Sequence, residues 1–244
     1  MRSAPLQLGQ SSTPAGMRLY AVGDVHGCDS MLAGAHAKIA KDLADRPVAD
    51  HRIVHVGDYC DRGPDSAGVV ERLAALTAGD PRVICLRGNH DQMLIDFLGD
   101  PATGGEMFLF NGGEATLASY GVPARFGPRR GYAALARALG EAMPAHHRAF
   151  FDGLALTARF GDYLFVHAGI RPGVPLDKQH PEDLVWIREE FLWDDRDHGF
   201  VVIHGHTPSD TDKVRPNRIN IDTGAVYGGT LTCLRLEGTD YRFL

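Results

Sequence analysis

The stretch Gly57-Asp58-Tyr59-Cys60-Asp61-Arg62-Gly63 carries the strongest indication of both fold and function in this chain. An apolar run, Ile53-Val54-His55-Val56, leads directly into it. The stretch then holds two carboxylates, a guanidinium and two glycines. Carboxylates that crowd at the end of a buried strand repel each other unless cations neutralise them. The sequence therefore predicts a buried strand, a tight turn and a cation-binding site at this point.

The composition of the 244-residue chain, 44% hydrophobic and 23% charged, indicates one sizeable soluble domain with its own core. A net charge of -6 without a basic run argues against nucleic acid as an obligatory partner. Residues 1–16 are rich in Ser, Pro, Gly and Gln, so we expect a flexible tail, neither a secretion signal nor a membrane anchor, before a single domain over 17–244. Four cysteines without close pairing favour reduced thiols in a cytoplasmic protein: Cys28, Cys60, Cys85 and Cys233.

The first half of the chain alternates apolar strands, polar turns and amphipathic helices, which is typical of a layered α/β protein. Residues 99–150 differ, because they predict helices and an arginine- and glycine-rich loop at 125–131, and we expect this helical insertion to edge the site. Asp29 or Ser30 is expected to cap the first helix, and Asp65 to start the second. Strands are expected over 17–22, 53–56, 82–86, 154–160, 163–166, 200–203, 218–221, 230–236 and 241–243, and the first helices over 29–47, 65–76 and 91–98.

Five of these apolar runs end in the same way, with an Asp, Asn or His beside a glycine. Ligand sites of open α/β sheets gather outside the carboxyl ends of the strands. A mixed set of carboxylate, amide and imidazole ligands suits two divalent ions of the transition type. The polar residues at these five ends are Asp24, His26, Asp58, Asn89, His90, His167 and His206.

A histidine taken alone is more often an ordinary core or surface residue than a ligand. His55 and His204 lie inside expected strands, which favours packing or supporting roles. The same ordinary interpretation applies to His36, His51, His146, His147, His180 and His198. The histidines at the five strand ends differ from these, because the same pattern of a polar residue beside a glycine repeats at each end.

The motifs Gly-Asp-x-His-Gly at 23–27, Gly-Asp-x-x-Asp-Arg-Gly at 57–63 and Gly-Asn-His-Asp at 88–91 occur in this order. Together with His167-Ala168-Gly169 and Gly205-His206, they resemble the phosphoprotein phosphatase family of calcineurin-like metallophosphoesterases. The stretches 111–113 and 219–225 look like the bacterial serine/threonine protein phosphatases. The resemblance implies a central β-sandwich of two mixed sheets flanked by helices, with the metal site at the C-terminal ends of the strands.

The resemblance also implies a ligand set for two metal ions that share Asp58. The related motif Gly-His-x-His supplies one more histidine in many metallophosphoesterases, but Pro208 stands at that position here and cannot ligate. The ligands accept Mn²⁺, Fe or Zn²⁺ alike, and we expect Mn²⁺ to serve in vitro. The first ion is expected to bind Asp24, His26 and Asp58, and the second Asp58, Asn89, His167 and His206.

The role that the resemblance implies for His90 is that of a general acid, with Asp61 holding its imidazole in the cationic form. A purely structural His90–Asp61 pair is the alternative. Cys60 lies inside the opening stretch, where a small buried hydrophobe is the ordinary reading and a reactive thiol the alternative.

Three arginines are expected to bind phosphate oxygens, since a planar guanidinium can bind them bidentately. Arg62 and Arg87 follow from the motifs and have bracing of the turns as an alternative role. The third arginine of the family lies between the two late histidines. Arg188 fits this place best, with Arg171 as its rival and a surface charge on a helix as the ordinary alternative for Arg188.

The implied activity is hydrolysis of phosphoserine and phosphothreonine in proteins by a metal-activated water. A sister interpretation is a symmetrical bis(5'-nucleosyl)-tetraphosphate hydrolase, against which Asp61 and the stretch 111–113 favour the phosphatase. A non-catalytic, metal-holding phospho-binding module is expected to have lost at least one site residue, and none is missing. A Rossmann-type dinucleotide binder needs Gly-x-Gly-x-x-Gly after the first strand, which the chain lacks.

Overall fold

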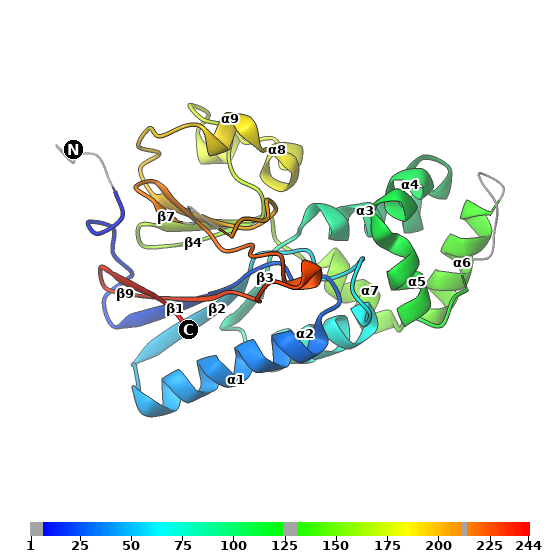
Figure 1. Cartoon of the computed structure of the whole chain (residues 1–244), viewed down its shortest axis with the longest axis horizontal. Helices are drawn as coiled ribbons and strands as arrows, with labels where there is room; N and C mark the ends of the chain where they lie inside the picture. The colour runs from blue at the N-terminus through cyan, green and yellow to red at the C-terminus, as the bar shows by residue number, and fades with distance from the viewer. Residues whose placement is uncertain (1–6, 124–130, 211–213) are drawn as a thin grey trace.

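The computed structural model of the chain describes residues 7–123, 131–210 and 214–244. Two mixed sheets pack face to face, with helices on their outer faces and a group of helices at one end (Figure 1). This architecture confirms the predicted α/β sandwich. The expected loop at 125–131 lies outside the described residues except for Gly131. No helix within the described ranges is long and apolar enough to cross a membrane.

The first sheet has five strands in the order β10-β9-β1-β2-β3. Strands β1, β2 and β3 are parallel to one another, β9 is antiparallel to β1, and β10 is antiparallel to β9. Because parallel neighbours need a crossover, helices join the parallel strands and lie on the outer face. The strands are β1 (Met17–Val22), β2 (Asp50–His55), β3 (Val83–Cys85), β9 (Cys233–Glu237) and β10 (Asp240–Phe243).

The second sheet also has five strands, in the order β4-β5-β6-β8-β7. Its β4–β5 pair forms the predicted hairpin, in which Phe160 pairs with Tyr163 across a turn at Gly161, whose φ is 57°. The parallel strands β5, β6 and β8 form its centre. The bounds are β4 (Thr157–Phe160), β5 (Tyr163–Val166), β6 (Val201–His204), β7 (Val214–Arg215) and β8 (Arg218–Asn220).

Strands β1, β5 and β6 are buried on both faces, which explains their unbroken apolar runs. In β1, Leu19 and Ala21 pack between the two sheets, whereas Tyr20 and Val22 pack against the helical side. In β5, Phe165 faces the inter-sheet core, and Leu164 and Val166 pack with residues of the helices above the second sheet. Each large side chain so buried contributes about 1.5–3 kcal/mol, so the sandwich is a rigid base for the site.

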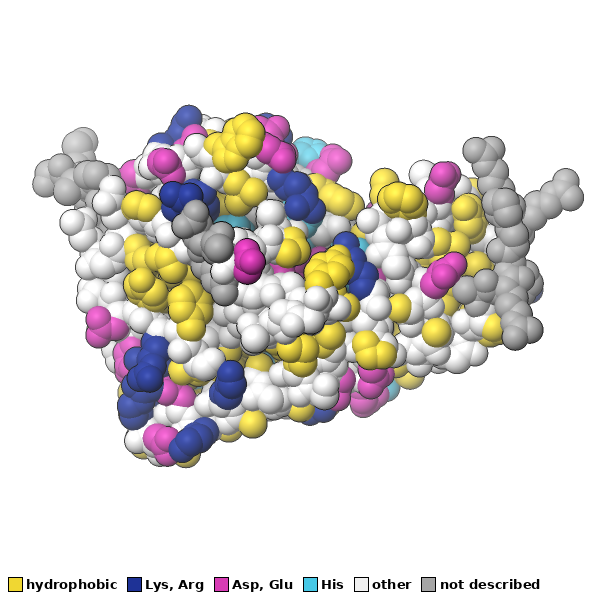
Figure 2. Space-filling model, in the orientation of Figure 1, with side chains coloured by type: hydrophobic (Ala, Val, Ile, Leu, Met, Phe, Trp, Pro, Cys, Tyr) yellow, Lys and Arg dark blue, Asp and Glu magenta, His cyan; other side chains and the backbone are white. Residues whose placement is uncertain are grey.

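Helices α1 and α2 cover the first sheet, α8 and α9 cover the second, and α3 to α7 lie at the end of the sandwich (Figure 1). A notch in the surface separates this helical end from the side of α8 and α9 (Figure 2). Asp65 caps α2 as predicted, because its Oδ1 accepts a hydrogen bond from Gly68 N. The predicted cap of α1 is wrong, since α1 begins after Cys28 and Asp29 instead pairs with Arg72. The bounds are α1 (Asp29–Asp45), α2 (Ser66–Gly79), α3 (Asn89–Gly99), α4 (Pro101–Phe108), the π-helix η1 (Leu109–Gly113), α5 (Glu114–Ser119), α6 (Tyr132–Ala142), α7 (Ala145–Asp152), η2 (Leu176–Lys178), α8 (Pro181–Trp186), α9 (Glu189–Leu192) and η3 (Ala225–Tyr227).

Residues 7–16 do not form the flexible segment that their composition predicts. Ser11 is fully buried, and Ser12 N donates to Asp162 Oδ2 at 3.0 Å. Leu8 N donates to Pro216 O, and Thr13 N to Gly238 O. The prediction of a flexible tail is therefore wrong for residues 7–16, because backbone bonds to distant loops, which composition does not reveal, hold them on the sandwich.

Candidate metal centre

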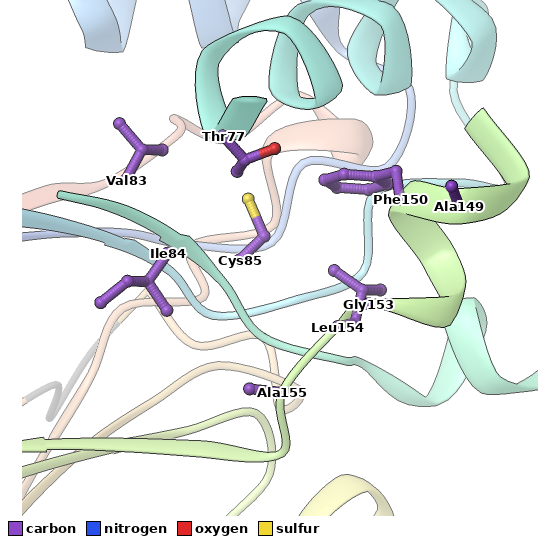
Figure 3. A pocket seen from close by; sticks show the side chains of 9 residues that line it. All are labelled: Thr77, Val83, Ile84, Cys85, Ala149, Phe150, Gly153, Leu154 and Ala155. Atoms are coloured by element: carbon purple, nitrogen blue, oxygen red, sulfur yellow. The ribbon is translucent and has the colours of Figure 1, made fainter. Parts of the chain in front are cut away.

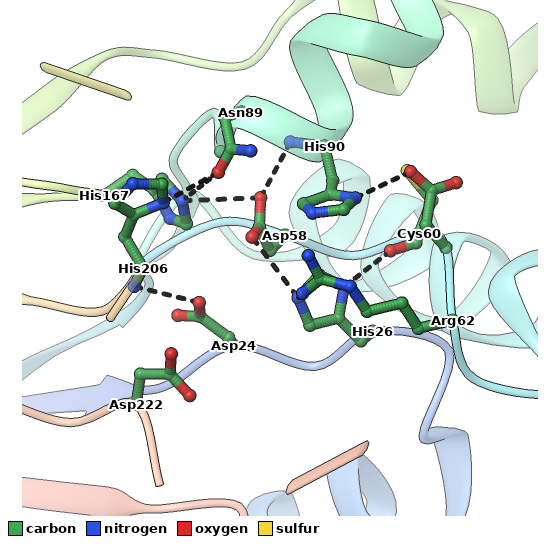
Figure 4. Close-up of polar contacts among 12 residues, drawn as sticks. Asp24, His26, Asp58, Cys60, Arg62, Asn89, His90, His167, His206 and Asp222 are labelled. Carbon is green, nitrogen blue, oxygen red and sulfur yellow. Dashed lines mark hydrogen bonds and ion pairs between the residues drawn. The ribbon is translucent and has the colours of Figure 1, made fainter. Parts of the chain in front are cut away.

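Five strand ends meet at one edge of the sandwich and bring all six predicted metal ligands together (Figure 4). Two ligands follow β1, one follows β2, one begins α3 after β3, and one each follows β5 and β6. All six are buried, none more than 5% exposed. They are Asp24, His26, Asp58, Asn89, His167 and His206.

The first group of ligand atoms surrounds His26. Its Nδ1 is 2.9 Å from Cys60 O, and because a carbonyl oxygen can only accept, Nδ1 carries the proton. Its Nε2 therefore holds a lone pair, which faces Arg62 Nη1 at 2.7 Å and Asp58 Oδ2 at 3.4 Å. Burial lowers the pKa of His26 well below its usual value, so the ring is neutral. Arg62 Nη1 donates to this lone pair, so a cation that binds His26 takes the place of the guanidinium.

The second group surrounds His167, whose Nδ1 donates to Val56 O at 3.0 Å. Its Nε2 lone pair then lies 3.0 Å from Asn89 Oδ1 and 3.4 Å from Asp58 Oδ1. Burial lowers the pKa of His167 to about 4, so Nε2 has no proton near neutral pH. Three acceptor atoms thus face one another, an arrangement that a cation between them relieves.

His206 adds a second imidazole to this group, with Nδ1 2.9 Å from Asn89 Oδ1. Asp24 completes the contact between β1 and β6, because its Oδ2 accepts from His206 N at 2.9 Å. Asp24 Oδ1 is buried without a hydrogen-bond partner. Buried polar atoms are normally satisfied, so this orphaned oxygen is a further sign of a ligand position.

Asp58 lies between the two groups (Figure 4). Its Oδ2 faces His26 and its Oδ1 faces His167, each at 3.4 Å. Oδ1 also accepts the backbone N–H of His90 at 3.0 Å. One carboxylate can therefore serve both groups, as a bridging ligand does.

Backbone strain gathers at this site. Positive φ is uncommon outside glycine and costs about 1–3 kcal/mol per residue. In the described ranges, every non-glycine residue with positive φ belongs to the predicted site: His26, Asp58, Asp61, Arg62 and His206. Such strain persists where the side chains must be aimed at one point.

The carboxylates of the site are destabilised as anions. Burial raises the pKa of Asp24 well above its usual range, and the negative charges of Asp222 and Asp58 add to the effect. The pKa values of Asp58 and Asp222 are also raised, chiefly by burial. Bound cations would reverse these shifts, because an opposite charge favours the ionised form. Asp222 lies beside Asp24, but sequence reasoning gave it no role although it stands in the quoted stretch 219–225 (Figure 4).

His90 and Asp61 form a buried pair, with Nδ1 and Oδ2 2.8 Å apart and side chains no more than 1% exposed. Burial lowers the pKa of His90 to about 4 and raises that of Asp61 to about 7. Desolvation by burial thus opposes a cationic imidazole, and the expectation that Asp61 keeps His90 cationic stays a prediction.

The helical insertion supports Asp61, which sequence reasoning did not foresee. Thr116 Oγ1 donates to Asp61 Oδ1 at 2.7 Å and accepts from Asp61 N at 2.8 Å. Ser66 Oγ accepts from the same N–H at 3.2 Å. Gly112 O accepts from Arg62 N at 3.1 Å. Thr116 and Asp61 are 55 residues apart, so no local pattern links them.

Asp91 holds the site loops together. Its carboxylate accepts hydrogen bonds from the backbone N–H groups of Asp58, Tyr59 and Gly88, at 2.8–3.0 Å. The motif at 88–91 contains Asp91, but its position gave no sign of this bracing role. Cys60 packs beside it, fully buried, and burial raises the pKa of its thiol well above the usual value. The structure thus favours packing over reactivity for Cys60, and all four cysteines are free.

Two of the predicted arginines lie at the site. Arg62 contacts His26 and places its guanidinium 5.6 Å from the ring centre of Tyr227. Arg188 donates from Nη1 to Thr207 Oγ1 at 3.2 Å, next to His206. Its charge helps to lower the pKa of His206, after burial and the neighbouring His167.

The other two arginines have partners of a different kind. Arg171 is exposed and pairs with Asp183 through Nε at 2.7 Å and Nη2 at 2.5 Å. Arg87 donates to Gln92 Oε1 at 3.0 Å and Leu154 O at 3.5 Å. This geometry favours Arg188 over Arg171 beside the ligands, and it gives Arg87 the bracing contacts that were its alternative role.

Comparison with known proteins agrees with this geometry. The chain is 30% identical to serine/threonine-protein phosphatase 1 of Salmonella typhimurium, over 90% of this chain and 92% of that protein. It is 28% identical to bis(5'-nucleosyl)-tetraphosphatase PrpE (asymmetrical) of Bacillus mycoides, over 90% of each chain.

The fold is also similar to solved structures. A crystal structure described as a putative diadenosine tetraphosphatase superposes with a TM-score of 0.64 at 21% identity, covering 96% of this chain and 97% of that one. The family described as calcineurin-like phosphoesterase matches residues 17–237. This chain therefore belongs to the calcineurin-like phosphoesterase family.

Proposed function

We propose that this chain is a phosphomonoesterase that uses two divalent metal ions and hydrolyses phosphoserine and phosphothreonine in proteins. The observation that carries the proposal is the lone pair of His167 Nε2, which is aimed at Asn89 Oδ1 and Asp58 Oδ1 inside a buried site. A carboxylate oxygen and a deprotonated imidazole nitrogen can both bind a metal ion, and neither can donate to the other. A bound cation is therefore the partner that the group lacks.

The ligand assignment follows from which atoms face each group. Asp58 is proposed to bind both ions, because its two oxygens point to different groups. The donor set of carboxylate, amide and imidazole groups suits Mn²⁺, Fe or Zn²⁺. Asp24 and His26 complete the first ion's ligands, and Asn89, His167 and His206 complete those of the second.

Divalent ions in this site would supply positive charge to phosphoryl oxygens and lower the pKa of an attacking water. The chain's own residues would do the rest. Arg62 at the first group and Arg188 beside His206 would bind the remaining phosphate oxygens, since guanidinium and phosphate match bidentately. Arg87 would brace the turn from which Asn89 projects.

His90 is proposed to protonate the leaving oxygen. Because Asp61 occupies Nδ1, the nitrogen left for the substrate is Nε2. Burial raises the pKa of Asp61 to about 7, so the pair can hold an extra proton near neutral pH and pass it through the imidazole. Asp61 acts through His90 and is a positioning residue, not a metal ligand.

The choice between a phosphoprotein and a dinucleotide substrate rests on two observations. The relative at 30% identity is named as a serine/threonine-protein phosphatase, and Asp61 is present and bonded to His90. Dinucleoside tetraphosphate hydrolysis is the second candidate, because relatives at 25–28% identity carry that name. These relatives are named as asymmetrical enzymes, whereas the sequence motifs suggested a symmetrical one.

A direct assay separates the candidates. With Mn²⁺ present, we expect release of inorganic phosphate from a phosphothreonine peptide, at a higher kcat/KM than hydrolysis of diadenosine tetraphosphate. Turnover of the dinucleotide without turnover of the peptide would reverse the order. The products would then distinguish two ADP, from symmetrical cleavage, from ATP and AMP. Failure to hydrolyse p-nitrophenyl phosphate after Mn²⁺ loading would instead support a non-catalytic, phospho-binding protein.

A further inference from the structure

A second cluster of metal-ligating side chains lies outside the centre described above, between α2 and α7. Glu71 Oε2 lies 2.9 Å from Nε2 of His146 and 2.9 Å from Nε2 of His147. The ligand atoms of all three residues lie within 4.8 Å of one another. Two imidazoles on successive residues of one helix thus converge on a single carboxylate from another helix.

The two histidines differ in their surroundings. His146 is exposed, whereas His147 is only 3% exposed and makes a second contact. Nδ1 of His147 lies 2.8 Å from the hydroxyl of Tyr120. A metal-binding histidine usually donates its other ring N–H to an oxygen, which fixes the ring and leaves the second nitrogen free to ligate. Tyr120 is placed to accept that proton, so Nε2 of His147 is oriented toward Glu71.

The dimensions fit a small divalent ion. Bonds of about 2.0–2.1 Å to zinc imply ligand-to-ligand distances of about 3.3 Å in a tetrahedral site. The two contacts of 2.9 Å need to open by only a few tenths of an ångström, which exposed Glu71 and His146 side chains can do. Two neutral imidazoles and one carboxylate form a donor set typical of zinc.

The cluster is open to solvent on one side. Glu71 and His146 line a groove of about 430 Å³ between α2 and α7, which leaves room for a water as the fourth ligand. The neighbouring hollow, of about 290 Å³, is different in kind. It is lined mainly by apolar side chains such as Val83, Ile84 and Phe150, and its only ligand-type side chain is Cys85 (Figure 3).

We propose that Glu71, His146 and His147 bind a third divalent ion of the zinc class, which joins α7 to α2. The site is independent of the catalytic function proposed above, because no residue is shared. It has a structural consequence near the centre, since α2 begins at Ser66, whose hydroxyl accepts the backbone N–H of Asp61. An ion here would fasten the end of the helical insertion to the helix that leads out of the site loop.

Equilibrium dialysis of the Mn²⁺-loaded full chain against Zn²⁺, followed by metal analysis, tests the proposal. We expect the wild type to hold one equivalent of metal more than Glu71→Gln, His146→Gln or the double variant. Glu71 and His146 are 61% and 55% exposed, so both substitutions leave the core untouched. His180→Gln, which removes an exposed histidine from α8's N-terminus, is the matched control and should retain the full count.

The thermal midpoint gives a second readout. Zn²⁺ should raise the midpoint of the wild type and of His180→Gln more than that of the double variant, because a ligand that binds only the folded state stabilises it. Activity on p-nitrophenyl phosphate should be equal in all of them with Mn²⁺ alone. Equal metal content in the wild type and the double variant would overturn the proposal and leave the cluster as a hydrogen-bonded pair of histidines on a carboxylate.

Discussion

Replacing His90 by Asn separates proton donation from metal binding. The substitution removes the imidazole that is bonded to Asp61 at 2.8 Å. It leaves the backbone N–H of residue 90, which donates to Asp58 Oδ1 at 3.0 Å, so the Asp58 carboxylate keeps this hydrogen bond. We therefore expect His90→Asn to retain its metal ions and to lose activity in a way that depends on the leaving group.

The size of the loss follows from what a buried, oriented acid contributes. General acid catalysis is worth about 10²–10⁴-fold. This equals about 2.7–5.4 kcal/mol of transition-state stabilisation at about 1.36 kcal/mol per tenfold. A phosphothreonine peptide or phenyl phosphate, whose leaving oxygen needs the proton, should lose kcat over that range. p-Nitrophenyl phosphate should lose much less, because its leaving group departs readily as an anion.

The assay compares kcat on the two kinds of substrate for the wild type, His90→Asn and His180→Asn, with metal content measured on each. His180 is exposed and belongs to none of the site motifs, so its Asn variant should behave as wild type. Equal losses on both substrates in His90→Asn would refute the general-acid assignment. Loss of metal from that variant would show that His90 supports the ligands and does not donate the proton.

Three shorter predictions follow from the same contacts. Thr116→Val removes the donor to Asp61 Oδ1 at 2.7 Å, so the free energy of unfolding measured in urea should fall by about 1.5–3 kcal/mol. The variant's kcat on phenyl phosphate should also fall while its metal content is kept. An unchanged kcat would contradict a positioning role for Asp61. Gly88→Ala would place a Cβ 2.1 Å from Asp58 Oδ1 and 2.4 Å from Asp58 N, so metal analysis should show loss of both ions, and a fully loaded variant would contradict the packing. Burial lowers the pKa of His55 to about 3 from 6.5, so as the pH falls the unfolded chain binds a proton at this residue before the folded chain does. The stability that this residue contributes above pH 6.5 is therefore lost as the pH drops toward 3, and between pH 7 and 5 the unfolding free energy should drop by about 2 kcal/mol less in His55→Gln than in the wild type. Equal drops in the two proteins would contradict this contribution.

The strand-end pattern made much of the site predictable. Each ligand directly follows an apolar run, and parallel strands that share a sheet end at the same edge, so Asp24, Asp58 and Asn89 had to meet. His167 and His206 follow strands of the second sheet, and here the order of the motifs carried the prediction. The two-sheet arrangement came from the family resemblance, since apolar runs alone do not say which strands pair.

What the sequence left open depends on contacts between distant segments. Thr116 reaches Asp61 only because the insertion folds back over the site loop, and nothing near Thr116 marks it as a partner. The packed segment 7–16 has the composition of a tail, yet its backbone finds partners in loops more than 100 residues away. Helices α8 and α9 have only six and four residues, too few to show a helical period.

The cluster of Glu71, His146 and His147 also could not be predicted from the sequence. His146 and His147 carry no motif, and Glu71 is 75 residues from the first of them. Only the packing of α7 on α2 brings the three together. Adjacent histidines on a short helix are a weak signal, which becomes specific once the facing carboxylate is known.

Within the stretch 57–63, Asp58 is proposed to hold both ions and Asp61 to hold none. Metal analysis of Mn²⁺-loaded Asp58→Asn and Asp61→Asn, side by side with the wild type, tests this assignment most directly. We expect two equivalents in the wild type and in Asp61→Asn, with a reduced rate in the latter, and loss of metal in Asp58→Asn. Equal metal loss in the two variants, or full retention in Asp58→Asn, would contradict it.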